Sequence, residues 1–530
     1  MIDIEQIQKA ISLTQQGKIL EAEEIYQNIL KENPDNPDIL SIIGLFYVNI
    51  SNFEKAVKIL EKAAELKQTL GTISALGFAY FEQKNYAEAA EYLEKSLEFG
   101  ENADIYNKLI LSLFEIKSYK KAIEYSEKMF SLYPNDTRAI TNRVKALTQQ
   151  GKMLEAEKLC IESLKQTPEV SSLWFHLGFL KELIYCDDKQ AIECYKAAAE
   201  LGNPQAFYNI AVSAQKLGRH EDAEKYYKKM LEFAPNDVET QTSLGMCYLS
   251  QKKFKQGYDL FFKREIAPAC RKCENLWKVG DKIADEILVV CEQGFGDHIQ
   301  FVRYLPFLPA KKINVAVPKA LKSLFATNYP NVNFINIDEI DPKMQALRIT
   351  DLAYILNKNF DNIPFSEGYL KSPKAEIEQE KLKVGLCWEA GSAGIRTMIN
   401  RTINIKCFEE LLNLEKAQIY SFQVDDTLKG CEQYPQMINL GKEFKDFSDT
   451  AKALMAMDVL VTVDTSVAHL AGALGVKTFL LLPYATDWRW FDDNKTTPWY
   501  KSVEIFKQTD GISWEKPIAE IVERVKKLAN

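Results

Sequence analysis

This chain of 530 residues lacks a long uninterrupted hydrophobic run. Its longest apolar stretch, residues 459–483, is interrupted by polar residues such as Asp464 and Lys477, so it is poorly suited to spanning a bilayer. The first residues, MIDIEQIQKA, place acidic groups where an export signal needs a basic region followed by an apolar one. We therefore expect no membrane span, no export signal and a cytoplasmic location.

An excess of positive charge is also absent, because 66 Lys and Arg face 74 Asp and Glu and give a formal net charge of −8. Nucleic-acid-binding proteins usually concentrate basic surface, so we expect no nucleic-acid partner. The 10 cysteines are scattered and favour reduced thiols over a disulfide framework. Cys270 and Cys273 have CxxC spacing but no second pair at zinc-finger distance, so buried or linker thiols are favoured over a metal site.

What the first half does contain is one pattern repeated, a small residue followed one turn later by a bulky one. Successive small residues lie 34, 33, 33, 34, 35, 32 and 34 positions apart. A glycine or alanine on each of two helices lets them approach closely, so each unit is expected to be a pair of amphipathic helices. A second small position, such as Gly44 or Gly77, precedes some of these residues by 12 positions. The recurring small residues are Ala22, Ala56, Ala89, Ala122, Ala156, Ala191, Ala223 and Gly257.

The period and the anchor residues resemble the tetratricopeptide repeat over roughly residues 4–265, with seven full units and a terminal eighth. Stacked helix pairs form a superhelix whose concave face binds extended peptides or protein surfaces. We therefore expect a protein partner on that face, where Asn107, Asn142, Arg143 and Asn209 are candidates. The alternative is an array that serves only as a spacer or dimerisation module, and a homo-oligomer stays open.

From about residue 286 the pattern changes to short apolar runs separated by helical segments. This alternation is typical of parallel sheets with helices on both faces. The runs are 287–291, 312–318, 332–336, 383–388, 417–424, 458–463, 477–483 and 503–508. The helical segments between and after them are 298–308, 318–327, 405–415, 447–456, 466–474 and 513–528.

The predicted fold class is therefore α followed by α/β. An all-helical superhelix occupies residues 1–265 and a linker occupies 266–285. Two Rossmann-like parallel-sheet domains follow at 286–379 and 380–530, joined by the polar string KSPKAEIEQEK.

Ligands of open parallel sheets bind beyond the carboxyl ends of the strands, and polar residues follow two of the predicted strands. The string EQGFGDH places Asp297 at a helix start after the first strand. After the strand 458–463, Thr465 and Ser466 begin a helix whose positive end suits phosphate, and His469 lies one turn further on. Alone, Asp464 and Thr465 fit an ordinary helix cap and His469 fits a structural histidine. Their combination favours a carboxylate opposite a phosphate site.

Several strings resemble bacterial proteins that fuse tetratricopeptide repeats to a glycosyltransferase domain of the heptosyltransferase-like, two-Rossmann (GT-B) type. They include EQGFGDHIQFVRYLP, KVGLCWEAGS, NRTINI, DVLVTVDTSVAHLAGALGVKTFLLLP, DWRWF and TPWY. The architecture is also similar to that of O-linked N-acetylglucosamine transferases and of repeat-bearing flagellin glycosyltransferases. The strings are distributed over the span of residues 287–510.

The resemblance implies roles for individual residues. Asp297 looks like the catalytic base, and Thr465, Ser466 and His469 look like the segment that holds the donor diphosphate, oriented by Asp464. The string WEAGSAGIRTMINRT lacks the glycine that usually follows the tryptophan turn. This leaves open whether Arg396 or Arg401 lies near the leaving phosphate.

The remaining implied residues surround the nucleotide and the acceptor. Trp388 and Gln423 correspond to strand ends lining the nucleotide cleft. Gln293, His298, Trp488 and Arg489 correspond to the vicinity of the sugar or acceptor.

These features predict an inverting, metal-independent glycosyltransferase that moves a sugar from a nucleotide sugar to Ser or Thr hydroxyls of a protein, such as flagellin or another surface protein. A base and a positive environment for the departing diphosphate meet the chemical needs without a metal, so we expect no cofactor beyond the donor substrate. The acidic pairs at 425–426 and 492–493 imitate a metal site, but the two-sheet pattern does not suit the metal-dependent class. The alternatives are a lipopolysaccharide-type transferase acting on a lipid-linked saccharide and a non-catalytic repeat scaffold. The nucleotide and the sugar stay open.

Overall fold

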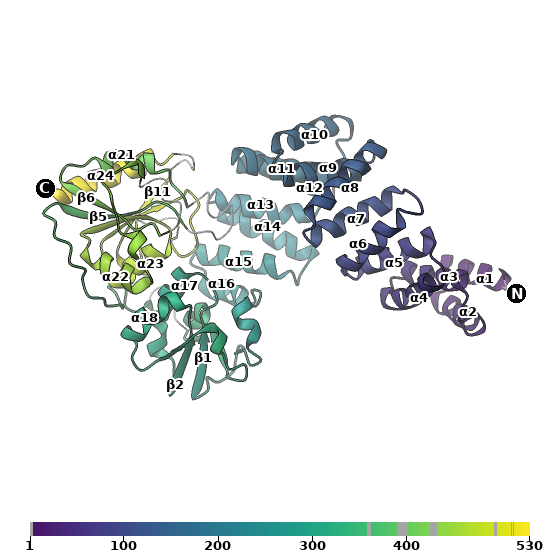
Figure 1. Ribbon diagram of the computed structural model, residues 1–530, viewed down its shortest axis with the longest axis horizontal. Coiled ribbons are helices and arrows are strands. Elements are labelled where there is room, and N and C mark those ends of the chain that lie inside the picture. The colour runs from purple at the N-terminus through teal and green to yellow at the C-terminus, as the bar shows by residue number, and fades with distance from the viewer. Residues whose placement is uncertain are drawn as a thin grey trace. The chain divides into compact units, whose positions relative to one another are not determined.

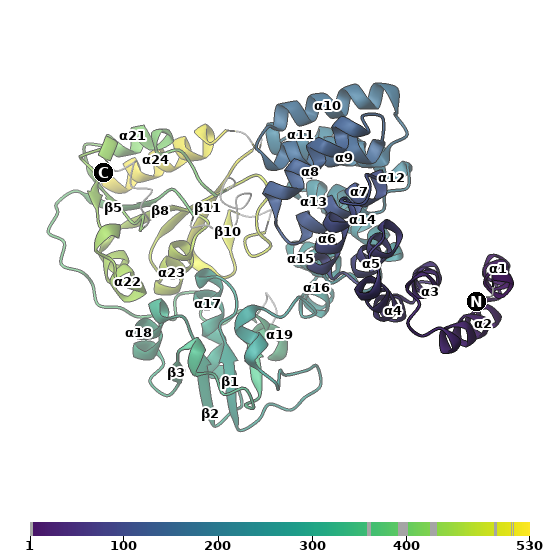
Figure 2. The ribbon, with the colours of Figure 1, turned by 45° about the vertical axis from the view of Figure 1, so that its right-hand side comes forward.

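A computed structural model of the chain describes residues 4–357, 362–390, 401–424, 432–491, 495–509, 511 and 513–530. The chain divides into two compact units, Met1–Ala206 and Phe207–Asn530. The first unit is helical, and the second combines the last helices of the array with two sheets. Figures 1 and 2 show the elements of each unit.

The predicted helix pairs are confirmed, since residues 4–261 form sixteen helices in eight successive pairs. The eighth pair is cut short, because its second helix has only 8 residues. The first unit contains α1 (Ile4–Gln15), α2 (Ile19–Glu32), α3 (Pro37–Asn49), α4 (Phe53–Leu66), α5 (Leu70–Glu82), α6 (Tyr86–Ser96), α7 (Ala103–Glu115), α8 (Tyr119–Leu132), α9 (Thr137–Gln149), α10 (Met153–Gln166), α11 (Ser171–Tyr185) and α12 (Asp188–Glu200). The array continues with α13 (Gln205–Lys216), α14 (His220–Phe233), α15 (Val238–Ser250) and α16 (Phe254–Phe261).

Glycines at the helix contacts explain the small positions of the repeat. A Cβ added at Gly44 on α3 would lie 2.4 Å from the Leu60 side chain on α4. At Gly77 on α5 the added atom would lie 2.7 Å from the Leu93 side chain on α6. These separations are below van der Waals contact, so α3 with α4 and α5 with α6 pack at a distance that a larger residue at these glycines would not allow.

The smaller sheet of the second unit has the strand order β3-β2-β1-β4, and all of its neighbouring strands are parallel. Its strands are β1 (Glu286–Val290), β2 (Lys312–Ala316), β3 (Asn333–Ile335) and β4 (Ala346–Arg348). The helices of this region are α17 (Phe295–Phe301), α18 (Lys319–Asn328) and α19 (Leu352–Ile355). The described part of this region also contains the short 3-10 segments η1 (Pro268–Lys272), η2 (Val302–Phe307), η3 (Ile337–Glu339) and η4 (Ile349–Asp351).

The larger sheet has the order β10-β11-β9-β8-β5-β6-β7, in which only the β10–β11 pair is antiparallel. Its strands are β5 (Leu382–Cys387), β6 (Ala417–Ser421), β7 (Ile438–Asn439), β8 (Val459–Val463), β9 (Thr478–Leu482), β10 (Thr496–Thr497) and β11 (Tyr500–Lys507). The helical segments are η6 (Ile405–Phe408), α21 (Glu409–Leu412), η8 (Gly441–Glu443), α22 (Phe447–Ala456), α23 (Ser466–Leu474) and α24 (Glu515–Ala529). The expected parallel sheets are therefore present after the helical array.

Both faces of the larger sheet are buried, as its continuously apolar strands predict. Along β8, Val459 and Val461 pack in the cluster that includes α24, whereas Leu460 packs in the cluster that includes α23. Figure 1 shows α21 and α24 on one face of this sheet and α22 and α23 on the other.

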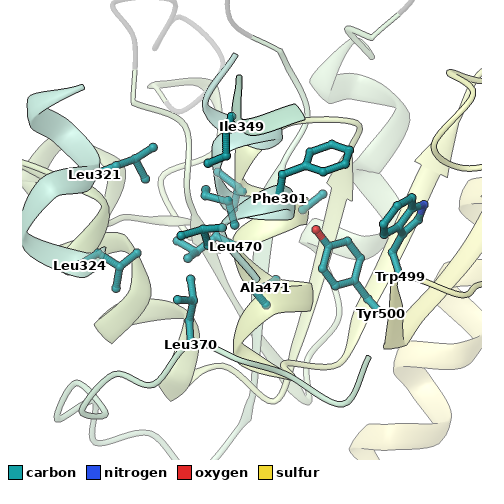
Figure 3. Packing of buried hydrophobic residues seen from close by; sticks show 14 of the residues in the cluster. Phe301, Leu321, Leu324, Ile349, Leu370, Leu470, Ala471, Trp499 and Tyr500 are labelled. Atoms are coloured by element: carbon teal, nitrogen blue, oxygen red, sulfur yellow. The ribbon is translucent and has the colours of Figure 1, made fainter. Parts of the chain in front are cut away.

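One hydrophobic cluster joins the regions of the two sheets inside the second unit. Figure 3 shows Phe301 and Leu321, which precede the larger sheet in the sequence, beside Leu470 on α23 and Tyr500 on β11. All four side chains are at most 1% exposed. The two sheet regions are therefore packed together through a common core.

Among the helices that the structure describes, none combines the length and the apolar character needed to cross a membrane.

Candidate functional site

The predicted site residues lie where the carboxyl ends of neighbouring parallel strands meet. In the larger sheet β6, β5 and β8 are adjacent and parallel, and Gln423, Glu389 and Thr465 follow them in turn. From the other sheet region, α17 packs against α23 (Figure 2). This contact brings the helix that carries Asp297 next to the helix that carries His469.

The two helices pack tightly at Gly296. A Cβ at this position would lie 2.7 Å from His469 Cδ2, so the imidazole ring occupies the space of the missing side chain. By contrast, a Cβ at Gly294 would meet only Asp297 Oδ2, at 3.6 Å. Of the two glycines in the turn, Gly296 is the one that packing requires.

Replacing Gly296 with serine should therefore lower the free energy of unfolding of the second unit by about 1–3 kcal/mol, because the new Cβ overlaps the His469 ring. The same change at Gly294 is the matched control and should cost less than about 0.5 kcal/mol, since its Cβ has room and serine is a good N-cap residue. Urea unfolding followed by tryptophan fluorescence measures both, because six of the seven tryptophans follow residue 207. Equal effects of the two substitutions would contradict this role of Gly296.

Asp297 lies in the first turn of α17 and forms an ion pair with Arg489 from the loop after β9. The second guanidinium nitrogen of Arg489 donates to Asp487 Oδ1 at 2.7 Å. Side chains of Asp297 and Arg489 are 16% and 15% exposed. Among the described residues, Asp297 Oδ2 has no hydrogen-bond partner, so one oxygen of this carboxylate is left for a ligand.

A second acidic group lies close by on the larger sheet. Asp464 Oδ2 is 3.4 Å from Arg401 Nε, and Asp464 Oδ1 is 4.0 Å from His469 Nε2. Burial raises the pKa of Asp464, while the positive charge of Arg401 opposes that rise. Arg401 therefore reaches the predicted phosphate segment, and Arg396 lies outside the described residues.

His469 is held by aromatic neighbours. Its Nδ1 is 3.0 Å from the Tyr500 hydroxyl, and its ring stacks on Trp490 with centroids 4.9 Å apart. Burial, together with the positive charge of Arg489, lowers the pKa of His469 to about 3. The imidazole is therefore neutral near pH 7, and it can contact a phosphate only through a hydrogen bond.

A pocket of about 310 Å³ opens beside this cluster, between the two sheet regions. Phe295 and Ala320 line it from the side of the smaller sheet, and three predicted donor-binding residues, Gln423, Thr465 and Ser466, line it from the other side. The full lining consists of Phe295, Ala320, Cys387, Glu389, Phe422, Gln423, Val424, Phe444, Lys445, Asp446, Phe447, Thr450, Thr465, Ser466 and Val467. Its lining combines four phenylalanines with seven polar or charged residues, so apolar walls and groups able to orient a small molecule occur together.

The amino end of α23 faces this pocket with an open cap. The N-cap residue Thr465 makes no side-chain capping hydrogen bond, whereas Asp446 caps α22 by accepting from the Ser448 amide. The first N–H groups of a helix have no partner within the helix, and its amino end is positive. The start of α23 is therefore suited to binding an anion.

The other two predicted donor-site residues support the site from within. Gln423 Nε2 donates to the Glu389 carbonyl at 3.1 Å and its Oε1 accepts from the Glu389 amide at 3.3 Å, so it fixes the segment after β5. Trp388 is 4% exposed and packs with Ile403 and Phe408 in the cluster on the α24 side of the sheet. It does not line the pocket.

Of the residues predicted near the acceptor, Gln293 is exposed and His298 and Trp488 are buried. The Trp488 ring packs on Tyr258 and Phe261 of α16, at centroid distances of 6.3 and 6.1 Å. His298 is 1% exposed, and within the described residues neither ring nitrogen has a hydrogen-bond partner of ordinary geometry. Burial lowers the pKa of His298 to about 4.

Because His298 is buried in its neutral form, we expect the free energy of unfolding to fall in acid. Between its ordinary pKa of about 6.5 and its folded pKa, the unfolded chain binds a proton that the folded chain does not, so stability falls as pH falls through this window. Replacing His298 with leucine should flatten the dependence of the unfolding free energy between pH 6.5 and 4 by up to about 1.4 kcal/mol per pH unit.

Urea unfolding at several pH values, followed by tryptophan fluorescence, measures this slope. The control is His176→Leu, because His176 also has a pKa lowered by burial to about 4 but lies in the first unit. An unchanged slope in the His298 variant would show that this group does not control acid stability.

A buried ion-pair network at the start of the glycine turn was not predicted from the sequence. Arg264, three residues after α16, donates to Glu292 Oε1 at 2.7 Å and to Asp351 Oδ1 at 2.6 Å. Arg348 also pairs with Asp351. Glu292 lies two residues after the end of β1, so the segment after the last repeat and the turn that leads to Asp297 share this network.

No group of three or more His, Cys, Asp or Glu side chains within the described ranges is arranged to hold a metal ion. The acidic pairs at 425–426 and 492–493 lie outside those ranges. Cys270 and Cys273 are both buried, in a small apolar cluster beneath β1 and β4.

Comparison with known families supports the reading of the helical half. Tetratricopeptide repeat models match residues 13–72, 69–103 and 204–237. The chain is also 22% identical over 459 residues to Protein FlbA of Caulobacter vibrioides, covering 75% of this chain and 74% of FlbA. Since the sixteen helices end at residue 261 of 530, this similarity extends into the sheet region.

Solved structures similar to this chain include three repeat proteins. A tetratricopeptide repeat protein from Parabacteroides merdae is 15% identical and has a TM-score of 0.42, covering 46% of this chain and 97% of its own. PilF of Pseudomonas aeruginosa is 23% identical with a TM-score of 0.31, covering 39% and 95%. YrrB, described as having an unusual peptide-binding site, is 22% identical with a TM-score of 0.30, covering 33% and 92%.

Proposed function

We propose that this protein is a glycosyltransferase that moves a sugar from a nucleotide sugar to a Ser or Thr hydroxyl of a protein bound by its repeats. The observation that carries the proposal is the position of Asp297. Its carboxylate has one oxygen without a partner among the described residues, and its helix packs against α23, whose amino end is suited to an anion. In this proposal residues 286–379 and 380–530 are the two halves of a GT-B unit.

The donor would occupy the pocket between the two sheet regions. Its diphosphate would bind the open amino end of α23 at Thr465 and Ser466. Arg401, which is paired with the adjacent Asp464, would add positive charge to this site. The aromatic walls of the pocket suit the flat face of a nucleobase. This arrangement would stabilise the charge of the departing nucleotide without a metal ion.

The transfer step follows from these positions. Asp297 Oδ2 would accept the proton of the acceptor hydroxyl while the hydroxyl oxygen bonds to the anomeric carbon. The bond from that carbon to the diphosphate breaks, and the nucleotide leaves with the electron pair. Attack opposite the leaving group inverts the anomeric centre.

The repeats favour a protein acceptor over a lipid-linked saccharide, because stacked helix pairs recognise extended peptides. Of the predicted concave-face residues, Asn142 is 2% exposed and its Nδ2 donates to Asn107 Oδ1 at 3.0 Å, so it joins two adjacent repeats and is not open to an acceptor. Flagellin or another surface protein, modified in the cytoplasm before export, is the acceptor to test first.

Thermal denaturation of the full-length protein with UDP, GDP, ADP, CMP and their sugar conjugates tests the donor site, because a ligand that binds the native state raises Tm. We expect one nucleotide class to raise Tm, an equal rise in the Asp297→Ala variant and a smaller one in His469→Ala. No rise with any nucleotide would contradict the proposal.

A non-catalytic repeat scaffold is the second candidate, and the sixteen helices that fill residues 4–261 favour it. Sugar transfer to purified flagellin separates the candidates. Nucleotide binding without transfer to this acceptor would favour the scaffold. Transfer that survives deletion of residues 1–206 would contradict recruitment of the acceptor by the first unit.

A further inference from the structure

Three consecutive residues in the loop between β9 and β10 connect separate parts of the second unit. Asp487 accepts from the Arg489 guanidinium and, at 3.1 Å, from the Arg489 backbone amide. Trp488 packs on the last repeat helix, α16. Arg489 reaches the Asp297 carboxylate, 192 positions earlier in the chain.

The contact with Arg489 uses only one oxygen of Asp297. The guanidinium donates to Oδ1, whereas Oδ2 lies over Gly294, where a Cβ would meet no other atom within 4 Å. Gly294 is exposed, so this side of the carboxylate faces open space. The arginine thus fixes which oxygen is presented outward.

Arg489 is itself held in place. Its Cζ lies 4.6 Å from the centroid of the Trp488 ring, and its carbonyl accepts from Trp499 Nε1 at 2.8 Å. The Asp487 contact holds the second guanidinium nitrogen at 2.7 Å. A planar guanidinium that is already fixed by several contacts loses little conformational entropy when it orients a carboxylate.

We propose that Arg489 is the positioning residue for Asp297, because it anchors Oδ1 so that Oδ2 is aimed at the acceptor hydroxyl. The contact of Trp488 with α16 in turn fixes the position of Arg489. This inference rests on the proposed glycosyl transfer. It makes the geometry of the catalytic base depend on the last repeat, because Trp488 lies between Tyr258 on α16 and Arg489.

The test compares Arg489→Met, which keeps the length and removes the charge, with Arg489→Lys, which keeps the charge. Transfer of the sugar to purified flagellin gives kcat, and calorimetry with the free nucleoside diphosphate found in the Tm screen gives Kd. We expect kcat of the methionine variant to fall about 10²-fold, as for a misplaced catalytic group, with Kd changed less than about twofold. The lysine variant should recover part of kcat.

A loss of nucleotide affinity larger than the loss of kcat would overturn the proposal, because Arg489 would then be a donor ligand. Trp488→Leu should lower kcat in the same way, by a smaller factor. If it leaves kcat unchanged, the dependence on α16 is wrong.

A second experiment tests the contact between Arg489 and Asp297 without measuring sugar transfer. Tm is measured for Asp297→Ala, Arg489→Met and the double variant, with Arg489→Met plus Asp338→Ala as control, because the exposed Asp338 has no ion pair with a described residue. If Arg489 holds Asp297, the double variant should lose clearly less than the summed losses, whereas the control pair should be additive. Additive losses in the Asp297 pair overturn the proposal. Absence of transfer by the wild type would instead refute the proposed function, and the cycle would still decide whether Arg489 fixes this carboxylate.

Discussion

Replacing Asp297 with asparagine should lower kcat for sugar transfer by about 10²–10⁴-fold, the range that a general base contributes. Asparagine keeps the size of the side chain and can still accept from Arg489, but it cannot take a proton from the acceptor hydroxyl. The nucleotide should bind as before, because Asp297 is not among the residues that line the pocket. The variant therefore separates the chemical step from donor binding.

Transfer to purified flagellin and calorimetry with the nucleotide measure these two effects. Asp338→Asn serves as the matched control, since Asp338 is an exposed aspartate of the same unit, and it should leave both unchanged. Full activity in the Asp297 variant would show that another group removes the proton and would refute the assignment of the base.

The second large effect is expected at Arg264, where methionine should lower the free energy of unfolding of the second unit by about 3–5 kcal/mol. The Arg264, Glu292 and Asp351 side chains are 6%, 0% and 2% exposed. Removing the guanidinium leaves the buried Glu292 without a cationic partner and Asp351 with Arg348 alone, and buried charges are costly when unpaired. Burial already raises the pKa of Glu292 against the opposing charge of Arg264.

Arg524→Met is the control for this change, because Arg524 pairs with Glu504 at the surface, where the side chains are 53% and 29% exposed. An exposed pair contributes only about 0–1 kcal/mol. Urea unfolding followed by tryptophan fluorescence compares the two variants. Adding Glu292→Gln to Arg264→Met should restore part of the loss, since Glu292 is then no longer an unpaired buried charge and Asp351 keeps its pair with Arg348. Similar small losses for Arg264→Met and Arg524→Met would show that the network adds little.

The elements with strong local signals were predictable from the sequence. Helices α22 (Phe447–Ala456) and α23 (Ser466–Leu474) have the predicted bounds. Asp446 caps the first, and the second ends at Gly475, whose φ of +75° favours glycine. The helix pairs were predictable because the small residues that permit close packing recur at a fixed spacing.

Elements without such signals were missed. Strands β4, β7 and β10 have only two or three residues each, which is too short to show an apolar alternation. The helix predicted at 298–308 begins three residues earlier and continues as the 3-10 segment η2, which contains Pro306. Proline lacks the amide that an α-helix interior needs.

In the candidate site, the residues that follow strands were predictable and the long-range contacts were not. Nothing local to Arg489 indicates its pairing with Asp297, because the two lie 192 positions apart. For Trp388, a local signal did exist. Trp388 lies two residues after Leu386 and four after Val384, which both pack in the cluster on the α24 side of the sheet. Side chains two residues apart on a strand point to the same face, so this spacing indicates that side for Trp388.

The way the helical array ends has a consequence for how its length can vary. Exposed ends of stacked repeats usually need a polar capping helix, but here Leu249, Tyr258 and Phe261 of the last pair are buried in the same cluster as the sheets. That pair has no free outer face onto which another repeat could stack. Relatives with more or fewer repeats should therefore gain or lose them in the part of the array before α15, and the final pair should be retained in all of them.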